Sequence, residues 1–122
     1  MDAQFNQHIV DFSSSADPAS INVPVGAYVV LAKTGLYNIS GSTQTTECQL
    51  QQGAGNGNVL DVIDVTLTSA QTAAISLMAS TNVTASGGER LALHCICVGC
   101  GGNMRSFFSH LAAIQVGTLS VP

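Results

Sequence analysis

The four cysteines are the residues of this chain best suited to chemistry, and three of them lie close together. Cys97 and Cys100 form one CxxC motif, Cys95 and His94 come just before it, and Cys48 is distant. A structural zinc site takes four Cys or His ligands, and two CxxC knuckles would indicate it strongly. Only one is present, and two of the cysteines share a strand face with leucines, where a thiol packs well. We therefore interpret the cysteines as buried reduced thiols and expect no metal, with a disulfide and a metal site as the alternatives.

The sequence contains no set of residues typical of an active site. It has no G-x-S-x-G motif, and its histidines lie in ordinary polar or alternating contexts. Asp61 and Asp64 fall on opposite faces of a predicted strand, so they cannot act together as a general acid and base. The Gly53–Gly57 run precedes no helix whose N-terminus would hold a phosphate. We expect no catalytic residues, no bound cofactor and no enzyme activity.

Charge is scarce in this chain and excludes several partners. Only 8% of the 122 residues are charged, the net charge is −4, and Lys33, Arg90 and Arg105 are the only basic residues besides histidine. Three cations cannot neutralise a run of phosphates or bind an anionic bilayer, so we expect no nucleic-acid and no membrane partner. No stretch reads as a membrane helix or a signal peptide. A surface poor in ions costs little to desolvate, which favours burial in a permanent assembly.

The elements that position these residues are predicted to be strands. Glycine, serine and threonine are spread along the chain, and no window sustains a helical repeat of apolar residues. Period-two alternation and short β-branched runs instead indicate strands, separated by turn residues. The expected strands are Ala27–Leu31, Leu36–Thr46, Val59–Thr68, Ala73–Ala79, Asn82–Ala85, Arg90–Val98 and Arg105–Val116. Together they predict an all-β protein, built as an antiparallel sandwich or barrel.

Three sequence motifs resemble one known family. Thr34–Gly41 is similar to its T-G-x-Y-x-F/I-S strand, and Ser86–Leu93 to its G-D/E-x-V-x-L approach to a late strand. Ser106–Ala113 is similar to its closing S-x-F-S-G-F-L-L strand, except that His110 replaces a small residue. In this order the motifs resemble the trimeric jelly-roll superfamily of complement globular heads and tumour necrosis factor. The acidic calcium cluster of some members is absent.

The resemblance implies an antiparallel jelly-roll β-sandwich that forms a homotrimer. A short, weakly charged chain without a stalk is most similar to the capsid decoration (cement) proteins of tailed bacteriophages. That implies a structural virion protein on the capsid surface, assembled in the host cytoplasm, with the major capsid protein as its partner. The alternative is the trimeric receptor- or glycan-binding head of a phage fibre or adhesin.

The resemblance and the aromatic residues together suggest two sets of contact residues. We expect the trimer interface at Tyr37, Ile39, Phe107 and Phe108, although ordinary core packing would also account for these side chains. Residues 1–20 are interpreted either as an arm ahead of the jelly-roll domain, residues 21–122, or as its first strand. As an arm, this segment would dock on the capsid through Phe5, Ile9, Val10 and Phe12.

Overall fold

The computed structural model describes residues 2–6, 9–53, 57–98, 100 and 103–117, with the backbone alone described for residues 2–6. These residues form nine strands and no helix, so the expected all-β fold is confirmed. The strands are β1 (Asp2–Asn6), β2 (Val10–Phe12), β3 (Ser15–Val23), β4 (Gly26–Asn38), β5 (Gln44–Gln52), β6 (Asn58–Leu67), β7 (Thr72–Val83), β8 (Glu89–Val98) and β9 (Met104–Val116).

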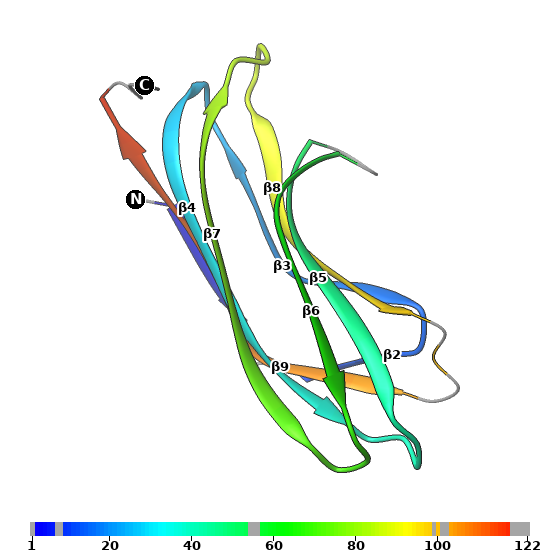
Figure 1. Ribbon diagram of the computed structural model, residues 1–122. Helices are drawn as coiled ribbons and strands as arrows, with labels where there is room; N and C mark the ends of the chain where they lie inside the picture. Colours follow the sequence, from blue (N-terminus) through cyan, green and yellow to red (C-terminus); the bar gives the residue numbers. More distant parts are fainter. Residues whose placement is uncertain (1, 7–8, 54–56, 99, 101–102, 118–122) are drawn as a thin grey trace.

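The strands form two antiparallel sheets that face each other (Figure 1). Sheet A has the order β1-β9-β4-β7, with β2 also paired to β9, and sheet B has the order β3-β8-β5-β6. The large side chains between them are apolar and almost fully buried: Tyr28, Leu36, Leu50, Leu67, Leu91, Leu93, Met104 and Leu111. Burial of apolar surface between the sheets, at roughly 25 cal/mol per Å², is the main stabilisation that such a sandwich has.

Three of the expected strands are confirmed within one residue at each end. Val59–Thr68 corresponds to β6, Arg90–Val98 to β8 and Arg105–Val116 to β9. In β8 the leucines and cysteines are buried, whereas His94 and Ile96 on the other face are only partly buried, as alternation predicts.

The single strand predicted for Leu36–Thr46 is wrong, because Asn38 ends β4 and organises a turn. The buried Asn38 side chain donates from Nδ2 to the carbonyl oxygens of Ser42 (2.7 Å) and Leu67 (2.9 Å). Its Oδ1 accepts from the Ser40 amide at 2.9 Å and from the Ser40 hydroxyl at 2.7 Å. Such side-chain bonds satisfy the backbone locally and compete with the sheet ladder.

Two other boundaries also differ from the prediction. Ala73–Ala79 and Asn82–Ala85 lie in or beside one long strand, β7, which pairs without interruption with β4 from Tyr37↔Thr72 to Gly26↔Val83. β3 (Ser15–Val23), which contains Asp17 and Pro18, was not among the expected strands, whereas Ser13 and Ser14 lie in the bend before it. A register shift between Ala16 and Ala19 accommodates Pro18, which has no N–H for the ladder.

Most of the described residues among the first twenty lie in strands of the two sheets. β1 pairs with residues 109–113 of β9, and β2 pairs with residues 104–106. The Phe12 side chain is 6% exposed and belongs to the core. Phe12 was expected to dock on a partner, and its burial corrects that expectation.

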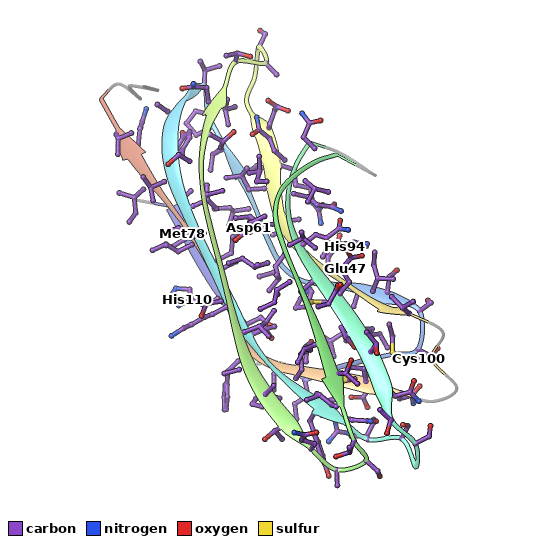
Figure 2. All side chains as sticks on the ribbon, viewed as in Figure 1. Glu47, Asp61, Met78, His94, Cys100 and His110 are labelled. Carbon is purple, nitrogen blue, oxygen red and sulfur yellow. A yellow bond between two sulfur atoms is a disulfide. The ribbon has the colours of Figure 1, made fainter. Side chains whose placement is uncertain are left out.

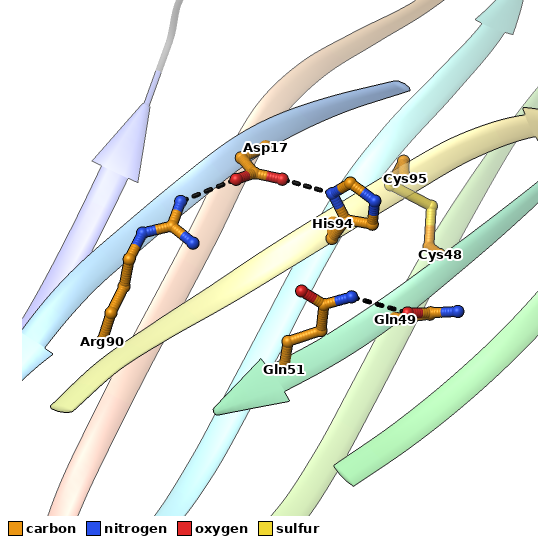
Figure 3. Close-up of polar contacts among 7 residues, drawn as sticks. All are labelled: Asp17, Cys48, Gln49, Gln51, Arg90, His94 and Cys95. Carbon is orange, nitrogen blue, oxygen red and sulfur yellow. Dashed lines mark hydrogen bonds and ion pairs between the residues drawn. A yellow bond between two sulfur atoms is a disulfide. The ribbon is translucent and has the colours of Figure 1, made fainter. Parts of the chain in front are cut away.

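The interpretation of the cysteines as reduced thiols is wrong. Cys48 on β5 and Cys95 on β8 are direct register partners with Cα atoms 4.0 Å apart, and they form a disulfide (Figure 3). Cys97 is bonded to Cys100, which leaves no cysteine free. The order of strands in sheet B brings Cys48 and Cys95 together, and spacing along the sequence could not show that order.

Candidate functional site

The outer face of sheet A carries several exposed apolar side chains. All six aromatic residues lie in strands of sheet A. Its outward-facing side chains on β4, β7 and β9 include the exposed Leu31, Met78, Phe108 and Ile114. Figure 2 shows Met78 and His110 on this side of the sandwich, and Glu47 and His94 on the opposite side. Contiguous apolar surface on a small domain marks an interaction site.

A β-bulge in β9 determines what this face presents. Lys33 pairs with His110 and Gly35 with Phe107, so Thr34 alone stands opposite both Phe108 and Ser109. The extra residue reverses the alternation of the strand. Without it, Phe108 would continue the core positions of Met104 and Ser106; instead its side chain is 58% exposed.

The backbone at the bulge is strained in the way expected of a functional position. Phe108 has φ = 50°, in the left-handed region that bulky side chains rarely adopt. Such a conformation costs about 1–3 kcal/mol and persists only when surrounding contacts impose it. One contact is directly below the bulge, where the buried hydroxyls of Thr34 and Ser109 are 2.8 Å apart and hydrogen-bonded. The Thr34 hydroxyl also donates to the Phe107 carbonyl oxygen at 3.3 Å.

The ring of Phe107 lies close against Gly35 of the neighbouring strand. A Cβ atom at Gly35 would come within 2.3 Å of the Phe107 ring, so a larger residue there would displace it. The Phe107 and Phe108 rings meet edge to face, with centroids 5.9 Å apart and planes at 79°. This geometry is favourable for an aromatic pair. Gly35 thus holds Phe107 in a position from which it supports Phe108.

Four of the eight predicted contact residues meet in one groove. Tyr37, Phe107 and Phe108 line a groove of about 300 Å³ together with Ile9 and Arg105. Ile9 was predicted to dock on the capsid, but it lines the groove together with residues predicted to form the trimer. It is 59% exposed. Val10 pairs with Ser106 next to it. For Phe5 the structure describes the backbone register with His110, and its side chain lies outside the described part.

Ile39 is the predicted interface residue that the structure places elsewhere. It follows the last residue of β4 and lies in the turn organised by Asn38 rather than on the sheet face. Its expected alignment with Tyr37 depended on the single strand Leu36–Thr46, which does not form. Sequence reasoning also missed Thr34, Gly35 and Ser109, although the T-G pair within the first family-like motif was a signal.

An ion pair closes the rim of this groove. Arg105 donates from Nε to Asp11 Oδ1 at 2.7 Å and from Nη2 to Oδ2 at 3.2 Å. The hydrogen bond from Arg105 holds the pKa of the Asp11 carboxyl below its ordinary value of 3.8. The two-point contact fixes β2 against β9 next to Phe107.

A second polar cluster lies on the outer face of sheet B, shown in Figure 3. Asp17 on β3 accepts hydrogen bonds from Arg90 (2.7 Å) and from His94 Nδ1, both on β8. Burial acts to raise the pKa of Asp17, but the bonds from His94 and Arg90 outweigh it and hold the pKa below 3.8. Gln49 and Gln51 continue the polar row on β5, where the Gln51 amide donates to Gln49 at 2.7 Å. The cluster ties β3 to β8 beside the bulge at Pro18.

The described residues offer no metal centre, since no three of their Cys, His, Asp or Glu side chains gather around a common point. None of the described segments is a helix that could cross a membrane.

Comparison with solved structures shows the fold. Eiger TNF from S. frugiperda matches with a TM-score of 0.62 at 14% identity, over 98% of this chain and 94% of that one. The sugar-binding C-terminal domain of EclA matches with a TM-score of 0.55 at 12% identity, over 88% and 79%. The VP2 subviral particle of infectious bursal disease virus matches with a TM-score of 0.58 at 11% identity, over 93% of this chain and 32% of that one. The chain is a jelly roll. No family model matches the sequence, and no curated protein matches it.

The bulge predicts an unusual order of stability at position 108. Glycine adopts positive φ without strain and alanine does not, so Phe108→Gly is expected to be more stable to unfolding than Phe108→Ala by about 1 kcal/mol. Urea denaturation of both variants under reducing-agent-free conditions measures the difference. If the alanine variant is the more stable one, as at ordinary strand positions, the bulge does not impose positive φ.

The Asp17 cluster predicts acid-dependent stability. Because the folded pKa of Asp17 is depressed, its contribution to the free energy of unfolding is present above pH 3.8 and is lost as pH falls through the folded value. Asp17→Asn removes that contribution, so the stability gap between wild type and variant should be constant near neutral pH and close at low pH. Denaturant unfolding over a pH series measures this gap. A gap that stays constant into the acid range would contradict the assignment.

Proposed function

We propose that this chain is a structural virion protein, a homotrimeric capsid decoration protein that adds to an assembled capsid and stabilises its lattice. The observation that carries the proposal is the apolar outer face of sheet A, where a strained bulge exposes Phe108 beside Phe107 and Tyr37. An exposed aromatic cluster held by its own backbone is well suited to be the centre of an interface. The homotrimer follows from the family resemblance of the sequence motifs.

The composition supports a role in a permanent assembly. With 8% charged residues, the chain presents few ions that an interface would have to desolvate. Among the basic residues, Arg90 and Arg105 are already engaged by Asp17 and Asp11. The jelly-roll fold is shared with the capsid protein VP2 of infectious bursal disease virus, which is compatible with a virion component.

The mechanism proposed is stabilisation by binding. A protein that binds the assembled lattice and not the free subunits lowers the free energy of the lattice by RT ln(1 + [L]/Kd). This role needs no catalytic group and no cofactor, in accord with a candidate site made of aromatic and aliphatic side chains.

A trimeric glycan-binding head is the second candidate, favoured by the amide and carboxylate row on sheet B. Glu47 and Gln49 are partly exposed and offer hydrogen-bonding groups of the kind that sugars require, and the sugar-binding domain of EclA shares the fold. Sugar sites usually add an aromatic surface. All aromatic residues of this chain lie in sheet A, so the outer face of sheet B lacks the aromatic surface of a usual sugar site. Glycan binding is therefore the second candidate.

The trimer is tested by placing a charge at the proposed interface. Phe108→Asp is expected to give monomers, since an unpaired charge in a dry interface costs several kcal/mol. Val98→Asp is the matched control, because Val98 on sheet B is 56% exposed and Phe108 is 58% exposed. Native mass spectrometry should find wild type and the control as trimers of the 12.5 kDa chain. Equal trimer fractions in both variants would contradict the placement of the interface.

The same variants test the capsid role by co-sedimentation with particles stripped of this protein. Wild type and Val98→Asp should sediment with the particles and raise their melting temperature, while monomeric Phe108→Asp should stay in the supernatant. A trimeric wild type that never sediments with particles, but is retained on a glycan array, would replace this proposal with the second candidate.

A further inference from the structure

A second groove on sheet A is lined by charged side chains and lies apart from the aromatic groove. It has a volume of about 640 Å³ and lies over β4 between β7 and β9. Leu31, Met78 and Ala112 supply its apolar lining, and Lys33 and His110 are adjacent register partners within it. Asp61 reaches the same groove from β6 of the other sheet.

Lys33 stands out among the basic residues. Arg90 and Arg105 form salt bridges with Asp17 and Asp11, whereas Lys33 forms none with any side chain that the structure describes. Lys33 lies on the central strand of an apolar face. If that face is buried in an assembly, the ammonium group needs an acidic partner, because an uncompensated buried charge is strongly destabilising.

Asp61 is the acidic residue that lines the same groove, and it comes from the edge of the other sheet. Figure 2 shows it between β6 and β7, the edge strands of the two sheets. Its Oδ2 accepts from the Met78 amide at 3.0 Å and its Oδ1 from the Val62 amide at 2.9 Å. A carboxylate has about four acceptor positions, so capacity remains for a further donor after these two bonds. Within one chain Asp61 and Lys33 line the same groove without forming a salt bridge.

The edge formed by β6 and β7 is also apolar. Val62 is 48% exposed, Met78 63% and Val59 49%. Val59 and Val62 extend this edge away from the groove, and Met78 and Asp61 lie where the edge meets the groove around Lys33. A ring with threefold symmetry requires an interface made from two different patches of the same chain, one donated and one received.

Resting on the trimer proposed above, we propose that Asp61 of each protomer pairs with Lys33 of the next, the β6–β7 edge of one copy covering the groove over β4 of its neighbour. His110, next to Lys33 in register, lies in position to contact the same carboxylate. The partner copy thus completes a site that a single chain leaves without its ion pair.

A mixing experiment separates pairing between chains from pairing within one. Lys33→Asp and Asp61→Lys each create like charges at every interface of their own homotrimer, and the dissociation constant should rise about tenfold or more. In a mixture of the two variants, every contact between unlike chains restores an opposite-charge pair. With one variant labelled with ¹⁵N, native mass spectrometry should therefore find mixed trimers above their statistical share.

Asp64→Lys is the matched control, because Asp64 lies on the same strand with its side chain on the opposite face of β6. Mixed with Lys33→Asp, it should give only the statistical share of mixed trimers.

A statistical share for the Asp61→Lys mixture as well would overturn the pairing while leaving the trimer intact. A wild type that is itself monomeric or dimeric would overturn the trimer, and the pairing with it. Circular dichroism of each variant checks that the chain folds. Lys33→Met and Asp61→Asn remove the attraction without adding repulsion, so they should weaken the trimer less than Lys33→Asp and Asp61→Lys do.

Discussion

One extra residue in β9 decides what this protein shows to its surroundings. On one side of the bulge, Met104 and Ser106 face the core; on the other, Ser109, Leu111 and Ala113 do. A regular strand could not satisfy both halves, because its alternation would reverse one of them. The bulge lets the core-facing residues on both sides of it point inward, and it leaves the Phe108 side chain outside, with its backbone in the left-handed region. The Thr34–Ser109 hydrogen bond and the glycine under Phe107 keep it there.

The two sheets expose different kinds of side chain. Sheet A holds all the aromatic residues and exposes several of its apolar side chains, and sheet B carries the Asp17 cluster and the row of glutamines on its outer face. The Cys48–Cys95 disulfide and the Asp17 bonds tie neighbouring strands of sheet B together. Such a division, with one sheet fixed and the other exposing apolar side chains, is what a protein covered by copies of itself requires.

The sequence predicted the fold class and several strands because alternation is a local signal. The predicted strands match β6, β8 and β9 within one residue at each end, but the bulge that reverses the alternation within β9 was missed. It failed at Asn38, whose buried amide replaces ladder bonds with turn bonds, and so misplaced Ile39. The disulfide and the bulge depend on which strands become neighbours, and no local pattern carries that information. Tyr37, Phe107 and Phe108, chosen from the resemblance and from their aromatic side chains, line one groove, and their role in an interface stays a prediction.

The central claim is that the outer face of sheet A is covered in the native assembly. Hydroxyl-radical footprinting of the wild-type protein, followed by peptide mass spectrometry, measures this at individual side chains. At concentrations where the protein is assembled, Phe108 and Met78 should be protected from oxidation relative to dilute protein, while Val98 on sheet B should react equally in both. Equal oxidation of Phe108 and Met78 at both concentrations would show that the face stays open to solvent, and would contradict the account.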